Sequence, residues 1–305
     1  MVGSAARRDP ALRDESAPQL LVTMFLAYWF GNPEFVPSAL LVALLGAFGI
    51  GEPAARAALS RLSRRGDLEA TRTGRYTAYR LAPASFAAAR DQGSRMLRFG
   101  TPRAWDQRWT CVVFSIPEAA RGRRPALRQR LRDLQLGPLF DGFWITPRAP
   151  LDAIDRMLRD LDVRDAAVFR VREVPRPEGV DLLSAWDLAA LRAGYDGLVA
   201  HVEPVLRELR AGTLAGDEAL VRRVALCSRW RALAQADPGL PPELLPADWP
   251  QGRARDLFVE AFDTLGPPAE QFVRRLAATA ARGRSTPAPH SRCMADCQAP
   301  VAAGA

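Results

Sequence analysis

Lysine is missing from this chain of 305 residues, and histidine occurs only twice. All 42 basic residues are therefore arginines, a bias typical of GC-rich coding that alone says little about function. The GxSxG, phosphate-binding (Walker) loop, GxGxxG and HExxH motifs are absent as well. Two histidines are too few for a typical acid–base site. These absences argue against an enzyme, and no cofactor is expected.

Cysteine is also scarce, with four copies in the whole chain. A disulfide framework is not expected at that density. Cys111 and Cys227 lie in apolar runs and are interpreted as buried small side chains. Cys293 and Cys297 lie near His290, but this group lacks the four ligands of a structural zinc site. No bound metal is predicted.

Hydrophobic runs long enough to cross a bilayer are not found either. The two longest apolar stretches, 20–30 and 39–50, fall short of the roughly 20 residues that a membrane span needs. The segment before them carries charges of both signs, which is not the pattern of a signal peptide. We therefore expect both stretches to be core helices of a cytoplasmic protein with no membrane partner.

The N-terminal region, 16–82, predicts three helices followed by a hairpin. Ser16 is placed to cap the first helix, and Gly66 is placed to end the third. Two short β-type runs then flank the turn pair Thr73 and Gly74. Three helices and a hairpin in this order are typical of a winged helix-turn-helix domain.

The rest of the chain predicts a multidomain α+β protein with two further domains and a tail. Strands and helices alternate over 105–175, which favours a ferredoxin-like α+β domain. Helical patterns then dominate 181–282, and the tail 283–305 has the composition of a disordered segment. The expected central elements are strands at 108–117, 139–147 and 166–174 and helices at 122–136 and 150–161, and the last two expected helices of the chain cover 253–266 and 268–281.

The third helix of the N-terminal domain has two unlike faces. At 100° per residue, one apolar stripe faces the predicted core, formed by Ala55, Ala58, Leu59 and Leu62. The face roughly opposite carries small and basic side chains, namely Arg56, Ser60, Arg61, Ser63 and Arg64. Small residues let a backbone approach a DNA groove while arginine reaches guanine edges or phosphates. The hairpin tip adds Arg72, Arg75 and Tyr76, where a wing would touch the DNA backbone.

The net charge supports this interpretation through its distribution. Residues 1–104 hold fourteen arginines against eight acids, while 105–180 hold fourteen against eleven and 181–305 fourteen against fifteen. Positive charge concentrated in one module is expected when that module meets a polyanion. We predict binding of double-stranded DNA, with a solvated basic face on a non-enzymatic interaction scaffold as the alternative.

Three stretches resemble the PaaX family of phenylacetate-degradation repressors. They are "RAALSRLSRRGDLEATRTGRYTAYRL", "WTCVVFSIPE" with the helix and strand that follow it, and "DPGLPPELLPADWP". The resemblance runs from about residue 18 to about residue 280 and implies the three domains above. It also implies a homodimeric, sequence-specific transcriptional repressor. Release from the operator by an aryl- or acyl-coenzyme A such as phenylacetyl-CoA is implied as well.

Two further hypotheses concern the central and C-terminal regions. The central domain is similar to the small nuclease subunit of CRISPR adaptation complexes, which needs a metal-binding Asp after its first strand. Ser115 stands at that place and Glu118 lies beyond a proline, so a nuclease is the weaker alternative. For the effector, Trp230 and Arg231 could hold an acyl group and a phosphate. The alternative is that Trp230 belongs to the core.

Overall fold

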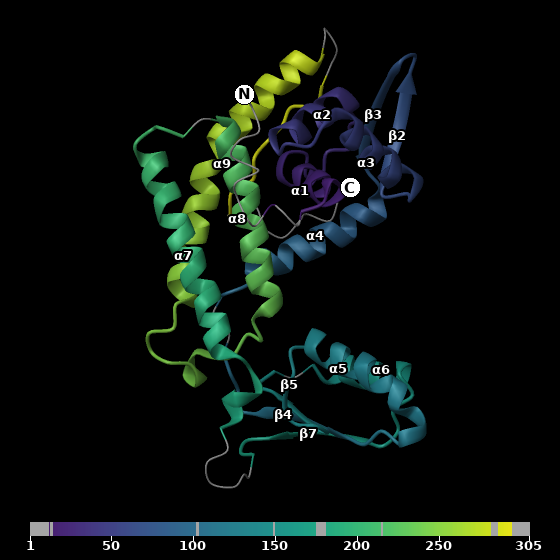
Figure 1. Cartoon of the computed structure of the whole chain (residues 1–305), viewed down its shortest axis with the longest axis vertical. Helices are drawn as coiled ribbons and strands as arrows, with labels where there is room; N and C mark the ends of the chain where they lie inside the picture. The colour runs from purple at the N-terminus through teal and green to yellow at the C-terminus, as the bar shows by residue number, and fades with distance from the viewer. Residues whose placement is uncertain are drawn as a thin grey trace. The chain divides into compact units, whose positions relative to one another are not determined.

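Two units, each drawing on more than one stretch of sequence, make up the computed structural model (Figure 1). The structure describes residues 12, 15–101, 104–148, 150–174, 181–214, 216–281 and 286–294. Unit 1 comprises Met1–Phe99, Gly197–Ala232 and Arg253–Ala305, and unit 2 comprises Gly100–Asp196 and Leu233–Gly252. The predicted α+β chain with a helical C-terminal part is confirmed.

Unit 1 begins with three helices whose ends follow from local sequence. Ser16 accepts a hydrogen bond from Gln19 N, and the Gln19 side chain accepts one from Ser16 N, so the first helix opens with a capping box. Gly66 ends the third helix at φ +79°, a conformation that glycine adopts without strain. The elements of this part are α1 (Ala17–Tyr28), β1 (Val36–Pro37), α2 (Ser38–Ala47), α3 (Glu52–Arg64), β2 (Leu68–Thr73), β3 (Tyr76–Leu81) and α4 (Pro83–Arg98).

The hairpin β2–β3 turns one residue later than the sequence predicted. Thr73 is the last residue of β2 and pairs with Tyr76, so the turn consists of Gly74 and Arg75. Gly74 takes φ +61° in the first position of that turn. The short strand β1 joins the other edge of β3, which gives a three-stranded sheet in the order β1-β3-β2.

The sheet of unit 2 has four strands where the sequence predicted three. The stretch 139–147, expected to be one strand, contains a chain reversal at Asp141 and Gly142. Gly142 lies close to the end of the first strand of this sheet, so that a Cβ at Gly142 would be 2.7 Å from Phe114 O. The elements are β4 (Trp109–Phe114), α5 (Arg124–Asp133), β5 (Gly137–Phe140), β6 (Phe143–Thr146), α6 (Leu151–Asp160) and β7 (Ala166–Val171). The antiparallel order β5-β6-β4-β7 with two crossover helices is the ferredoxin-like arrangement.

The two faces of this sheet are covered differently. Helices α5 and α6 cover one face around a core that includes Val112, Leu127, Leu131, Trp144 and Ile154. The other face, here called the helix-free face, packs at one end against the short 3₁₀ helix Leu182–Ala185. Three large apolar side chains of this face, those of Val113, Phe140 and Phe169, are 41%, 55% and 42% exposed.

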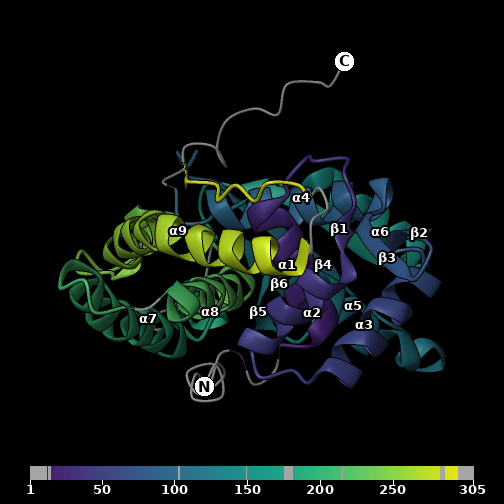
Figure 2. The same cartoon turned by 90° about the horizontal axis from the view of Figure 1, so that it is seen from above.

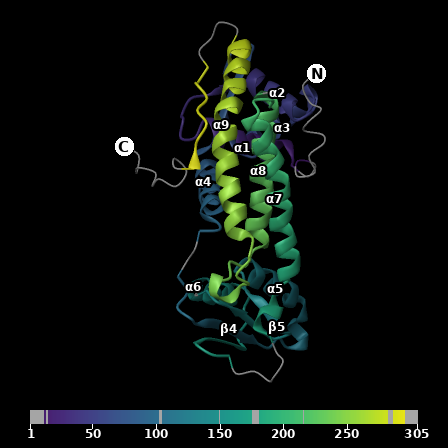
Figure 3. The same cartoon turned by 90° about the vertical axis from the view of Figure 1, so that its left-hand side faces the viewer.

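Three long helices form most of the C-terminal part, α7 (Leu188–Arg210), α8 (Gly216–Ala236) and α9 (Gln251–Ala281). They lie side by side in Figure 1 and Figure 3, and ion pairs Arg210–Glu260 and Arg253–Glu203 join α7 to α9. Among the described helices, none combines the length and apolar character of a membrane span.

Helix α9 is continuous where the sequence predicted two helices. Pro267 and Pro268 lack the backbone N–H that a helix interior needs, which is why a break was expected. Leu265 and Ala269 flank them and are fully buried, so packing on both sides holds the helix together.

Part of the tail that composition predicted to be disordered has defined contacts. Within residues 286–294, the backbone N–H of His290 donates to Tyr28 O at 2.9 Å, and Pro287 O accepts from the Trp29 indole at 3.1 Å. Met294 N donates to Asp263 in α9 at 2.7 Å. This segment therefore ties α1 to α9, beside which it runs in Figure 2 and Figure 3.

Gly137 in β5 offers a test of the packing in unit 2. A Cβ at this position would lie 2.6 Å from Trp186 Cε2 and 2.8 Å from the backbone oxygen of Ala185, which cannot rotate away. Gly137→Ala is expected to lower the free energy of unfolding by about 1–3 kcal/mol. Gly122→Ala, whose Cβ would meet nothing within 4 Å, is the matched control and should stay within about 0.5 kcal/mol. Calorimetric unfolding compares them, and equal stability of both variants would contradict this close packing.

Candidate nucleic-acid interface

Helix α3 is anchored in unit 1 by a narrow apolar stripe. Its fully or almost fully buried residues are the four predicted ones, Ala55, Ala58, Leu59 and Leu62. They pack in the core that α1 and α2 also form, and each of those helices contributes buried leucines. The rotation of α3 about its axis is therefore set by hydrophobic burial.

The opposite side of α3 gathers the residues predicted to contact DNA. Arg56, Ser60, Arg61 and Arg64 are exposed, and Ser63 is half-buried. The exposed side chains between the arginines are small, because Ala57 and Ser60 occupy those positions. A helix with such a surface can approach a groove closely while its arginines extend to base edges or phosphates.

The arginines of this face differ in their partners. Arg56 pairs with Glu52 one turn earlier at 2.7 Å, and Arg65 pairs with Asp67 at 2.9 Å. Among the described residues, the side chains of Arg61 and Arg64 form neither an ion pair nor a hydrogen bond. Exposed ion pairs contribute about 0–1 kcal/mol, so Arg56 can exchange Glu52 for a phosphate at little cost.

Local contacts order the tip of the β2–β3 hairpin. The Arg72 side chain donates to Gly74 O at 3.1 Å. The Arg75 Nε donates to the Tyr76 hydroxyl at 2.9 Å, and its guanidinium carbon lies 5.1 Å from the centre of that ring. Both arginines remain exposed, so the tip presents positive charge on a short, hydrogen-bonded loop.

The two residues predicted for the effector lie in unit 1 and have partners there. Trp230 is fully buried, stacks on Phe258 with 4.5 Å between ring centres, and donates to Met96 O at 2.9 Å. Arg231 forms an ion pair with Glu15. These contacts match the packing alternative for Trp230, and an effector role for either residue stays a prediction.

Ser115 and Glu118, the residues considered above for a nuclease metal site, have contacts of their own. Ser115 follows β4 directly, and its backbone N–H donates to Asp165 O at 2.8 Å. Glu118 is exposed and pairs with Arg121 at 2.9 Å. In the part of the chain that the structure describes, no group of three His, Cys, Asp or Glu side chains could hold a metal ion. Cys297 lies outside the described residues.

A buried polar cluster in unit 2 was missed by the sequence reasoning. The Tyr195 hydroxyl donates to the Asp237 carboxylate, and Gln251 Nε2 donates to the same carboxylate at 3.0 Å. Burial raises the pKa of Asp237 even though the Tyr195 hydroxyl, the Gly239 N–H and the charge of Arg148 favour its charged form. Gly239 takes φ +64° and packs against the Arg148 guanidinium. Asp237 and Gly239, in the run that begins "DPG", thus contact residues far away in the sequence, which a local sequence pattern does not reveal.

Comparison with known proteins gives matches in all three regions. Models of the PaaX family match residues 16–85 (PaaX-like protein), 102–181 (PaaX protein central Cas2-like domain) and 186–275 (PaaX-like protein C-terminal domain). The transcriptional repressor PaaX of Escherichia coli (strain K12) is 28% identical over 240 residues, which are 76% of this chain and 75% of that protein.

A solved structure shares the fold. The uncharacterized protein Rv0674 from Mycobacterium tuberculosis aligns with a TM-score of 0.56 at 24% sequence identity. The alignment covers 87% of this chain and 98% of that one.

Proposed function

The chain belongs to the PaaX family, and from this we propose that it is a transcriptional repressor that binds double-stranded operator DNA in a sequence-specific manner. The repressor role is supported by the similarity to the Escherichia coli repressor. The main support for placing the DNA-binding surface on α3 is its face of arginine and serine side chains, which lies opposite the buried stripe.

In this proposal the N-terminal part works as a winged helix-turn-helix domain. Helix α3 enters the major groove as the recognition helix, and α2 precedes it as the supporting helix. Arg56, Ser60 and Arg61 read base edges, with Ser63 and Arg64 beside them. The tip of the β2–β3 hairpin is the wing, and Arg72, Arg75 and Tyr76 contact the neighbouring phosphates.

We further propose that the protein acts as a homodimer. Two copies of one recognition helix read a symmetric operator, which doubles the contact surface without new chemistry. The exposed apolar side chains of the helix-free face, Phe140 and Phe169 among them, are candidate contacts for the second copy, because apolar groups exposed to solvent are often covered by a partner. An interaction scaffold with a merely solvated basic face remains the competing function.

Selection of bound DNA from random sequences separates these functions. The expected product is an inverted repeat with half-sites about one helical turn, roughly 34 Å, apart. The reason is that two-fold symmetry of the protein imposes two-fold symmetry on the operator. Recovery of no consensus sequence would favour the scaffold, and recovery of a single, unrepeated half-site would contradict the dimer.

Arginine replacements divide the surface into base readers and phosphate contacts. Arg61→Ala is expected to cost about 1–3 kcal/mol of operator binding and to relax specificity at particular base pairs. Arg75→Ala should weaken binding to all sequences alike and reduce the slope of log affinity against log salt by about 1. Fluorescence anisotropy at several salt concentrations measures both effects.

Arg164→Ala in unit 2 is the control for loss of one positive charge. Its side chain is 87% exposed and pairs with Asp162, as an ordinary surface arginine does. It should change operator affinity far less than the α3 variant. If Arg61→Ala weakens binding equally on every sequence, this residue is a backbone contact instead of a base reader.

For the regulatory ligand we propose an aryl- or acyl-coenzyme A, of which phenylacetyl-CoA is the compound that the family suggests. A ligand can loosen the DNA complex only by binding the DNA-free conformation more tightly. Couplings of this kind are typically about 1–3 kcal/mol. Arg231, predicted to meet a phosphate of this ligand, would have to give up its ion pair with Glu15.

Titration of the operator complex tests the ligand class. Phenylacetyl-CoA should lower operator affinity about 5- to 150-fold, which corresponds to the coupling above, while phenylacetate should not. The same titration with Arg231→Ala shows whether that arginine takes part. Release by the free acid and not by the thioester would overturn the proposed effector class.

A further inference from the structure

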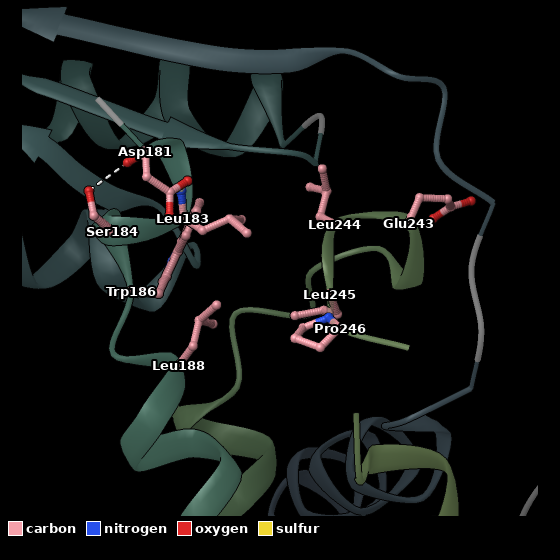
Figure 4. Close-up of a pocket in the computed structure, with 9 residues that line it drawn as sticks. All are labelled: Asp181, Leu183, Ser184, Trp186, Leu188, Glu243, Leu244, Leu245 and Pro246. Carbon is pink, nitrogen blue, oxygen red and sulfur yellow. Dashed lines mark hydrogen bonds between the residues drawn. The ribbon is translucent and has the colours of Figure 1, made fainter. Parts of the chain in front are cut away.

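Unit 2 contains an open pocket that the DNA-binding surface does not use. One wall is formed by Leu183, Trp186 and Leu188, from the 3₁₀ helix Leu182–Ala185 to the start of α7. Across from it lie Leu244 and Leu245, in and after the short 3₁₀ helix Pro242–Leu244 (Figure 4). Its volume is about 460 Å³, within the usual range of sites for small organic ligands. We call it the Trp186 pocket.

The aromatic wall of this pocket is held in place from behind. The Trp186 ring stacks on Trp109 of β4, with 6.3 Å between ring centres and 23° between planes. Gly137 leaves room for the same indole, because any Cβ there would collide with it. Leu244 from the opposite wall packs on the same apolar cluster around Trp109. A ligand would thus meet preformed apolar walls and would lose little affinity to ordering them.

The charged groups at the pocket are acidic. Asp181 and Glu243 supply carboxylates, and no arginine is among the described residues that line it. Asp181 is fixed in position, since its carboxylate accepts the backbone N–H of Leu183 at 3.0 Å. The two carboxylates repel anions, and no arginine among the described lining residues offsets this repulsion, although arginine is abundant in the chain.

We propose that the Trp186 pocket binds an uncharged aryl or alkyl group of a small ligand and rejects the corresponding carboxylate. Stacking and burial against Trp186 and the leucines supply the affinity. The two carboxylates accept N–H donors of the ligand, such as amides, and repel a second carboxylate. One part of this proposal rests on the proposed function: we take the bound aryl or alkyl group to be the acyl group of the effector.

Calorimetric binding to the full chain without DNA tests the site itself. The probes are S-phenylacetyl-N-acetylcysteamine, a neutral thioester without phosphates, and phenylacetate, which has the same ring and a negative charge. The neutral probe should bind at least 10-fold more tightly than the acid. Leu245→Trp, which fills the pocket, should weaken the neutral probe at least 10-fold. Leu151→Trp makes the same change at a residue outside the pocket that is 41% exposed, and it should leave binding unchanged.

An exposed substitution guards against misfolding of the filled variant. Glu243→Gln keeps the size of this exposed side chain and removes one negative charge. It should therefore reduce the difference in binding affinity between the neutral probe and phenylacetate. The proposal is overturned if the neutral probe fails to bind, if phenylacetate binds as tightly, or if Leu245→Trp binds the neutral probe like the wild type.

Measurements of operator binding distinguish a failure of the pocket proposal from a failure of the proposed function. Phenylacetyl-CoA that releases operator from wild type and Leu245→Trp alike would leave the effector class standing and overturn the pocket. A neutral probe that binds in the Trp186 pocket, with no thioester affecting the operator complex, would support the pocket and contradict the effector class.

Discussion

Four apolar side chains on one side of α3 determine where its arginines point. Ala55, Ala58, Leu59 and Leu62 are buried with α1 and α2, and a rotation of one residue would carry a guanidinium into that core. Burying such a charge without a partner is far more expensive than losing any contact that the arginines make themselves. The orientation of the basic face is thus maintained by hydrophobic packing, so its polar residues are free to meet another molecule.

The two faces of the sheet in unit 2 also differ in what covers them. Helices α5 and α6 cover one face with a conventional apolar core, while the helix-free face has an uneven cover. At one end, the segment around Trp186 and the loop with Leu244 pack on Trp109 and still leave a pocket between them. Elsewhere on this face, the side chains of Phe140 and Phe169 are exposed. A single sheet therefore combines a helix-covered core, a face that borders the Trp186 pocket, and exposed apolar side chains.

Sequence patterns predicted the parts of the fold that depend on near neighbours. The 3.6-residue period of α3 located its buried stripe, and Ser16 and Gly66 located helix ends. Features that depend on distant partners were not predicted. The continuity of α9 through two prolines requires packing on both sides, and the buried Asp237 meets Tyr195, which lies 42 positions away in the sequence. For the candidate site, the sequence predicted which side of α3 is exposed, apart from the half-buried Ser63, and contact of this side with DNA stays a prediction. The ion pair of Arg56 with Glu52 was not predicted.

The attachment of residues 286–294 to α1 bears on the order in which the protein is made. Unit 1 joins Met1–Phe99 to two later segments that begin at Gly197 and Arg253, and Tyr28 and Trp29 bind backbone groups of His290 and Pro287. A ribosome that has just finished α3 has yet to synthesise these partners. The N-terminal helices therefore acquire their complete packing only after residues 286–294 have been synthesised, and a nascent chain that stops short of them lacks these contacts at the end of α1.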